Sequence, residues 1–200
     1  MLNRSRISVS AIALLLLAPS VVQAADALTF TGGITFSSSD SYSVGWSFTT
    51  NAPVTVGSLG WYDVGTWSSS DVGIYNAANT LLTSTTVLNS DPLSNGFRYH
   101  AVSSVTLPAG TYKVAGVGKE FYCEKAANGT VVLISSVVTA PHIAYGSAFF
   151  QPSGSLVVPT IPGDRGVGYF GPSFQTVPEP GTYAALGLGA LALLRRKRSR

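Results

Sequence analysis

Large apolar residues alternate with small or polar ones in short runs through the middle of this 200-residue chain. The runs recur at intervals of about ten residues, with turn-forming residues between them, and a period of two is typical of strands buried on one face. The runs cover residues 44–49, 54–62, 71–75, 81–88, 97–102, 105–107 and 111–117. They predict an all-β domain, specifically a single β-sandwich of jelly-roll type.

Two segments that contain asparagine predict hairpins. Residues 76–79 are expected to turn the run at 71–75 back into the run at 81–88. Asn128-Gly129 is expected to join residues 121–125 to residues 131–138.

Residues 151–171 are dense in Pro and Gly and predict long loops. A last strand is expected over 167–170 and 173–175. Good helix formers are scarce between these elements, so we expect no helix of ordinary length in the middle of the chain.

Alternate positions of the runs are expected to face a common core. Trp46 and Trp61 are both expected there. The other inward residues predicted from the alternation are Leu59, Val72, Ile74, Phe97, Tyr99 and Tyr112.

The C-terminal end departs from the strand pattern. Pro178, Glu179 and Pro180 favour an exposed, extended hinge, because two prolines cannot continue a sheet or sit inside a helix. Residues 182–194 carry no charge and predict a membrane helix of about 20 Å, shorter than the hydrocarbon core of about 30 Å. The basic residues that follow, which resist crossing a membrane, are Arg195, Arg196, Lys197 and Arg198. We therefore expect residues 177–200 to be a sorting signal.

The N-terminal end predicts a secretory signal peptide over residues 1–24. Arg4 and Arg6 precede an apolar stretch, and small residues at Val22 and Ala24 suit a signal peptidase. Cleavage is expected after Ala24, and a second acceptable position after Ala27 stays open. The basic residues at both ends prefer the cytoplasm, so we expect residues 25–176 to be the exported domain.

The C-terminal segment resembles the PEP-CTERM sorting signal of Gram-negative bacteria. The resemblance lies in the Pro178-Glu179-Pro180 triplet, the apolar run behind it and the arginine-rich end. It implies a chain that is held in the inner membrane by its C-terminal helix and then cut near the triplet by a membrane protease, an exosortase. It also implies delivery to the cell surface or the extracellular medium in organisms that make exopolysaccharide.

Residues 44–118 also resemble a β-sandwich domain that often precedes such tails. The shared segments are Trp46-Ser47-Phe48, Leu59-Gly60-Trp61-Tyr62-Asp63, Val72-Gly73-Ile74-Tyr75, Phe97-Arg98-Tyr99 and Leu107-Pro108-Ala109-Gly110-Thr111-Tyr112. This resemblance implies a β-sandwich fold and implies no particular activity.

The positive charge of the whole chain belongs to its two ends. Without the signal peptide and the segment behind the hinge, five basic and nine acidic residues remain, a formal charge of −4. The exported part therefore lacks the basic patch that binding to nucleic acid requires. The single cysteine, Cys123, cannot form an internal disulfide and is expected to be a buried thiol.

Few titratable groups are available for catalysis. His100 follows Tyr99 in an expected strand, and His142 follows Pro141 in an expected loop. A Cys123–His142 nucleophile and base pair has no sequence feature to position it. We predict no catalytic residues and no cofactor.

Asp63 and Asp71 bracket a polar loop that offers further oxygen ligands, the type that Ca²⁺ prefers. A solvated loop capped by two turn-forming aspartates is the favoured interpretation. We therefore predict no metal site.

Trp67 lies in the same loop and is the tryptophan expected to be exposed, where its flat face is a possible glycan contact. The sequence favours a structural or adhesive protein of the cell surface or extracellular matrix. A carbohydrate-binding module that contacts exopolysaccharide is the alternative, and a hydrolase with an unrecognised site is a more distant one.

Overall fold

The computed structural model describes residues 24–123, 125–127, 130–132, 134–163 and 168–177. These residues form sixteen strands and no helix, so the all-β prediction is confirmed. The described part of the chain contains no helix of the length and apolar character that crossing a membrane takes. The predicted signal peptide before Ala24, the Asn128-Gly129 turn and the predicted sorting signal from Pro178 onward lie outside the described residues.

The larger sheet has seven strands, and all of its strand pairs are antiparallel. Its main path runs β14 (Ile161–Pro162), β13 (Ile143–Pro152), β3 (Ile34–Thr50), β9 (Gly110–Cys123), β5 (Ser69–Asn76) and β6 (Leu81–Leu88), and β15 (Tyr169–Phe170) also pairs with β9.

The second sheet has five strands, and the strand nearest the C-terminus lies inside it. Its order is β1 (Ala25–Asp26), β16 (Pro172–Val177), β4 (Val54–Tyr62), β8 (Phe97–Leu107) and β7 (Leu93–Ser94). Two short pairs complete the fold, namely β12 (Ile134–Thr139) with β2 (Leu28–Gly32) and β10 (Lys125–Ala127) with β11 (Thr130–Val132).

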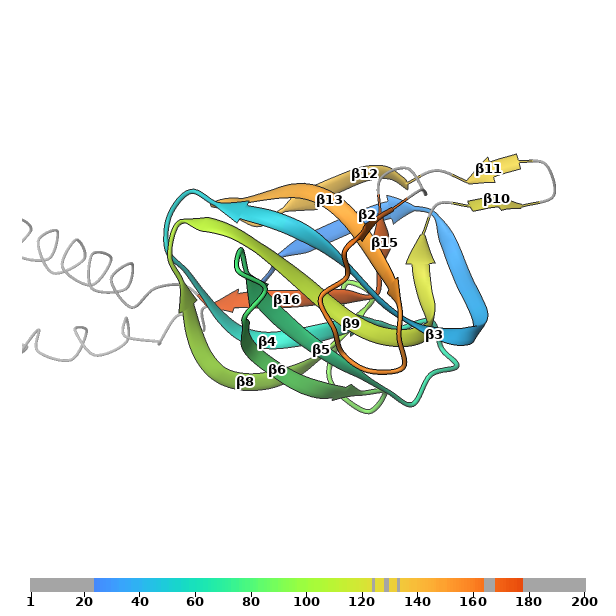
Figure 1. Ribbon diagram of the computed structural model, residues 1–200, viewed down its shortest axis with the longest axis horizontal. Coiled ribbons are helices and arrows are strands. Elements are labelled where there is room, and N and C mark those ends of the chain that lie inside the picture. Colours follow the sequence, from blue (N-terminus) through green and yellow to red (C-terminus); the bar gives the residue numbers. More distant parts are fainter. Residues whose placement is uncertain (1–23, 124, 128–129, 133, 164–167, 178–200) are drawn as a thin grey trace, which may run out of the picture.

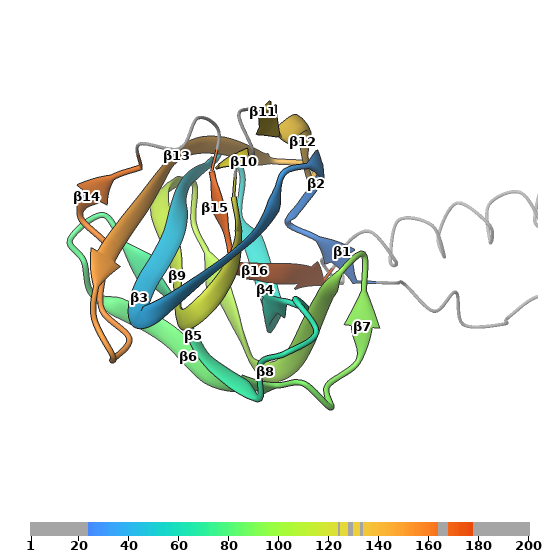
Figure 2. The same cartoon turned by 90° about the vertical axis from the view of Figure 1, so that its right-hand side faces the viewer.

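The two large sheets curve around one core and pack against each other (Figures 1 and 2). Trp46 on β3 stacks on Phe174 of β16 with ring centroids 6.0 Å apart, and Phe48 lies 4.9 Å from the same ring. The Trp46 indole N–H also donates to the carbonyl of Pro172 at 2.9 Å. All eight residues that the sequence predicts to face inward are buried, and large apolar side chains stabilise such a core by about 1.5–3 kcal/mol each.

The structure corrects several predicted strands. β3 starts at Ile34, ten residues before the predicted run, and β13 covers residues for which the sequence analysis predicts no strand. The hairpin expected around Asn128 is shorter than predicted, because β10 pairs only with β11. Residues 134–139 form β12, which pairs with the N-terminal strand β2 instead.

The ends of the long strands gather at two opposite ends of the domain. At the end that we call the terminal pole, Val177 pairs with Thr55 and Ala25 pairs with Thr176, so both ends of the described chain leave together (Figure 1). The turns of the terminal pole include residues 51–53, 108–109 and 140–142. At the opposite end, the distal pole, the loops 63–68 and 89–92 follow the far ends of β4 and β6.

Candidate functional site

Asp63 organises the loop of the distal pole that follows β4. Its amide donates to the carbonyl of Gly96 at 2.8 Å, which ties the start of the loop to the turn before β8. Its Oδ1 accepts a hydrogen bond from the amide of Gly65 at 2.9 Å. Gly65 has a φ of +88°, a left-handed conformation that glycine adopts without strain. The loop is therefore a local turn closed by its own aspartate.

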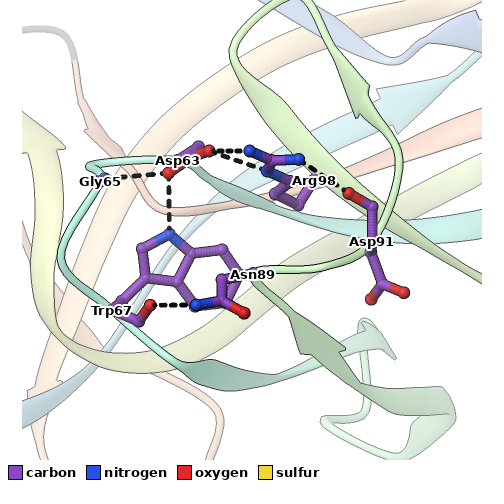
Figure 3. Close-up of polar contacts among 6 residues, drawn as sticks. All are labelled: Asp63, Gly65, Trp67, Asn89, Asp91 and Arg98. Atoms are coloured by element: carbon purple, nitrogen blue, oxygen red, sulfur yellow. Dashed lines mark hydrogen bonds and ion pairs between the residues drawn. The ribbon is translucent and has the colours of Figure 1, made fainter.

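Arg98 on β8 holds the same carboxylate from the other side (Figure 3). Its Nε and Nη2 both donate to Asp63 Oδ2 at 2.8 Å, and its Nη1 donates to the carbonyl of Asp91 at 3.1 Å. Partial burial disfavours the charged form of Asp63. The hydrogen bonds from Arg98, Gly65 and Trp67 outweigh this effect and lower the pKa of the Asp63 carboxyl.

Trp67 is held in one orientation by this network. Its indole N–H donates to Asp63 Oδ1 at 3.3 Å, and Asn89 Nδ2 donates to its carbonyl at 3.2 Å (Figure 3). Trp46 and Trp61 are fully buried, so Trp67 is the most exposed of the three tryptophans, as the sequence predicts. It is half-buried against the core and does not project freely.

A hollow of about 410 Å³ opens beside Trp67. Serine and threonine hydroxyls of β3 and of the Asp63 loop form much of its wall, and part of Trp61 also borders it. The hydroxyl residues of the wall are Ser37, Ser38, Ser41, Thr66, Ser68 and Ser69. The volume falls in the range of about 300–1,000 Å³ that is usual for small-molecule sites.

Glu120 on β9 is the oriented charge of this hollow. Ser37 Oγ donates to its Oε1 at 3.2 Å, and the hydroxyl of Thr66 donates to its Oε2. Each carboxylate oxygen therefore has a fixed direction and keeps capacity for a further donor. Lys119 also borders the hollow, so its wall combines a half-buried indole, a carboxylate, a lysine and many hydroxyls, a set of groups that suits a ligand rich in hydroxyl groups.

The other residues considered for chemistry lie apart. Cys123 is buried and pairs with Ile34 at the start of β3, whereas His142 precedes Ile143, which pairs with Thr50 at the end of β3. The Cys123–His142 pair is therefore not formed. His142 Nδ1 instead lies 2.9 Å from the side-chain oxygen of Asn51.

The two aspartates considered for calcium have separate partners. Asp63 binds Arg98, whereas Asp71 Oδ1 accepts a hydrogen bond from Thr86 across the β5–β6 hairpin at 2.6 Å. Within the described ranges, no three His, Cys, Asp or Glu side chains come together as a metal site would require.

His100 has a carboxylate partner that the sequence analysis missed. Its Nδ1 lies 3.1 Å from Asp91 Oδ2, and its side chain is 42% exposed. Asp91 also accepts from the amide of Leu88 at 2.8 Å, so it caps the turn after β6. The sequence feature that could have predicted this contact is the Asp91-Pro92 turn, which brings the aspartate back toward β8.

The chain ends form the second feature of functional interest. The amide of Ala27 donates to the carbonyl of Phe174 at 2.8 Å, and Ala27 and Phe174 are fully buried. Asp26 accepts hydrogen bonds from Gln175 Nε2 at 2.8 Å and from the side chains of Ser94 and Asn95. The first and last strands are therefore locked to each other and to the turn before β8.

These features define an all-β domain whose first and last described strands are paired with neighbours in one sheet and which carries a hydroxyl-lined hollow beside Trp67. Residues 176–199 match the sequence model of the PEP-CTERM protein-sorting motif. This match supports an exported protein that an exosortase processes, with the C-terminal segment anchored in the membrane before processing. Searches of curated proteins and of solved structures found no match to the chain.

The predicted sorting residues fall inside the matched segment. Pro178, Glu179 and Pro180, and the basic residues Arg195, Arg196, Lys197 and Arg198, lie outside the described residues. Ala24, the predicted end of the signal peptide, is the first described residue and directly precedes β1.

Proposed function

We propose that this chain is an exported protein that is first tethered to the inner membrane and then released by an exosortase to the cell surface or extracellular matrix. Its role there is structural or adhesive, in an exopolysaccharide or biofilm setting. The observation that carries the proposal is the sorting motif over residues 176–199, which begins as the last strand ends. Cleavage behind Val177 leaves β16 within the domain.

The proposal assigns a separate role to each of three segments of the chain. Residues 1–24 direct export and are removed by signal peptidase after Ala24. Residues 25–176 fold outside the cytoplasm. Residues 177–200 supply the Pro178-Glu179-Pro180 hinge, a membrane helix over about 182–194 and a basic stop, and the exosortase acts near the hinge.

The domain itself acts by binding or by packing, without catalysis. Proteins with this sorting tail are typically non-enzymatic surface proteins. In the described chain both histidines contact polar groups at separate places, and neither lies beside Cys123, as the strand register shows. The acidic residues near the hollow are engaged by Arg98, Ser37 and Thr66.

The test is mass spectrometry of the mature protein from cells that carry an exosortase. We expect loss of everything beyond the hinge. The triple replacement Pro178→Ala, Glu179→Ala and Pro180→Ala should leave the full C-terminal end attached, whereas Pro53→Ala, at another exposed proline, should be processed normally. Mature extracellular protein that still ends at Arg200 would contradict the proposal. So would a chain lacking residues 178–200 that reaches the same destination in the same amount.

A second candidate function is contact with exopolysaccharide, and the position of Trp67 beside the hydroxyl-lined hollow favours it. Aromatic faces pack against sugar rings, and a carboxylate such as Glu120 accepts from sugar hydroxyls. Trp67→Ala and Glu120→Gln should each weaken binding to the polysaccharide of the producing cell, measured by calorimetry. Thr80→Ala, at an exposed position after β5, is the control. Unchanged binding in both variants would remove this hollow as the site.

A further inference from the structure

Three turns of the terminal pole are bound to one another. Thr50 Oγ1 donates to the carbonyl of Pro108 at 2.8 Å and accepts from the amide of Gly110 at 3.1 Å. The amide of Asn51 donates to the carbonyl of His142 at 3.1 Å. The turns at 51–53, 108–109 and 140–142 therefore form one connected surface.

This surface carries no Asp, Glu, Lys or Arg. The strands that lead into and out of its turns are equally free of these residues over 41–62, 99–112 and 134–163. The exposed side chains of the turns are small, apolar or uncharged, apart from His142. They belong to Asn51, Pro53, Pro108, Ala109, Pro141 and His142.

Most charged residues of the described domain lie toward the other end. They include Asp63 and Arg98 in the loop network and Glu120 beside the hollow. The carboxylates closest along the chain to the two ends at the terminal pole are Asp26, which is held by Gln175, Ser94 and Asn95, and Glu179, two residues behind Val177. The turns of the terminal pole are therefore uncharged. Lys113 of β9, whose Nζ donates to the carbonyl of Pro159, lies three residues beyond Gly110, and most other charged residues lie toward the distal pole.

The chain leaves little distance between this surface and a membrane. β16 ends at Val177, and the apolar run begins at Tyr183. The five residues between them span at most about 18 Å when fully extended. The headgroup region takes up about 5–7 Å of that distance. A tethered domain therefore cannot turn its terminal pole far from the bilayer.

We propose that the terminal pole lies against the lipid surface while the chain is anchored, with the distal pole and its hollow directed away from the membrane. The proposal rests on the membrane anchoring proposed above. Charged groups lose hydration near hydrocarbon, and acidic ones are repelled by anionic lipid within a Debye length of about 8–10 Å. The uncharged turns avoid both penalties, and the surplus of acidic residues on the exported part makes the opposite orientation unfavourable.

The test uses the full chain in vesicles of phosphatidylcholine and phosphatidylglycerol, without a protease. A fluorophore is attached at Ala109→Cys on the terminal pole or, as the matched control, at Ser39→Cys on the bulge of β3, and nitroxide-labelled lipid headgroups serve as the quencher. Both positions are exposed, and the native Cys123 is buried. We expect quenching at position 109 to be several-fold stronger than at position 39.

Three outcomes of this experiment distinguish the proposed orientation from the proposed membrane anchoring. Stronger quenching at position 109 supports the orientation. A chain that floats with the vesicles but is quenched equally at the two positions, or more strongly at 39, overturns the orientation alone and leaves the exosortase as the partner to consider for this surface. A chain that does not float with the vesicles overturns the membrane anchoring, and the orientation with it.

Discussion

Arg98 directs both Nε and Nη2 at a single carboxylate oxygen of Asp63, each at 2.8 Å. The other oxygen of Asp63 accepts from Gly65 and Trp67. One ion pair between β8 and the end of β4 thus determines where the loop of the distal pole lies and how Trp67 is presented to the hollow.

Replacing Asp63 with Asn should destabilise the domain by on the order of 1–2 kcal/mol near neutral pH, because the Arg98 contact loses its charge. The pKa of Asp63 is lowered in the folded state, so its contribution is present above the ordinary aspartate pKa and is lost as pH falls through the folded value. The difference between wild type and Asp63→Asn should therefore shrink below about pH 4. Urea unfolding at pH 7 and pH 3 measures it, and a constant difference would contradict the assignment.

Tyr99 and Ser173 present an opposite case, because Tyr99 Oη and Ser173 Oγ are buried and neither makes a hydrogen bond of normal geometry, although they lie near each other and Tyr99 lies near Asp26. A buried hydroxyl with no partner carries a desolvation cost. We expect Tyr99→Phe to raise the free energy of unfolding by about 1 kcal/mol, since the ring and its packing are kept. The companion variant, Ser173→Ala, should also raise the free energy of unfolding. A loss of stability in Tyr99→Phe would mean that the hydroxyl is bonded in solution.

Tyr99 should also limit stability at alkaline pH. Burial first, and then the negative charge of Asp26, raise the pKa of Tyr99 well above its ordinary value. Because the pKa is raised on folding, neutral Tyr99 makes its full contribution to the free energy of unfolding below about pH 10. This contribution is lost as pH rises further, because Tyr99 ionises more readily in the unfolded chain. Thermal unfolding between pH 9 and pH 11 should show a smaller decline for Tyr99→Phe than for wild type. Equal declines would mean that groups other than Tyr99 limit the stability of the domain at alkaline pH.

The sequence predicted best where turn-forming residues border a run of strand-forming residues on both sides. The runs at 54–62 and 81–88 coincide with β4 and β6 for this reason, although only Val87 of β6 is buried. The first half of β3 was missed because it is rich in serine and carries a bulge between Ser37 and Tyr42, so its polar residues imitate a loop.

The site was predictable only in part, because residues that contact each other in it lie far apart in the sequence. Trp67 stood out as the tryptophan outside the alternating runs. Arg98 and Asp63 are 35 residues apart, and Ser37 and Glu120 are 83 apart. Only the pairing of β4 with β8 and of β3 with β9 brings these side chains together, and that pairing is not encoded in any local pattern.

The contacts of β1 favour a mature chain that starts at Ala25. Cleavage after Ala24 keeps Asp26 and Ala27, whereas cleavage after Ala27 removes the Asp26 hydrogen bonds to Gln175 and the buried Ala27. We expect N-terminal sequencing of the exported protein to begin at Ala25. A purified chain that begins at Leu28 should unfold at lower urea concentration than one that begins at Ala25. Equal midpoints would show that β1 is dispensable and would leave both cleavage positions open.

The last strand limits where the exosortase can cut. β16 lies between β1 and β4, its Phe174 is fully buried, and the carbonyl of its Pro172 accepts the indole N–H of Trp46. A cut within β16 would therefore break contacts of the folded domain, whereas a cut behind Val177 leaves all of these contacts in place. We expect a purified chain of residues 25–177 to unfold cooperatively and to keep its near-ultraviolet circular dichroism. A chain that ends at Gly171 should lose both, because it exposes the Trp46 face of the larger sheet. If the shorter chain folded equally well, β16 would be dispensable and the cut could fall before the hinge.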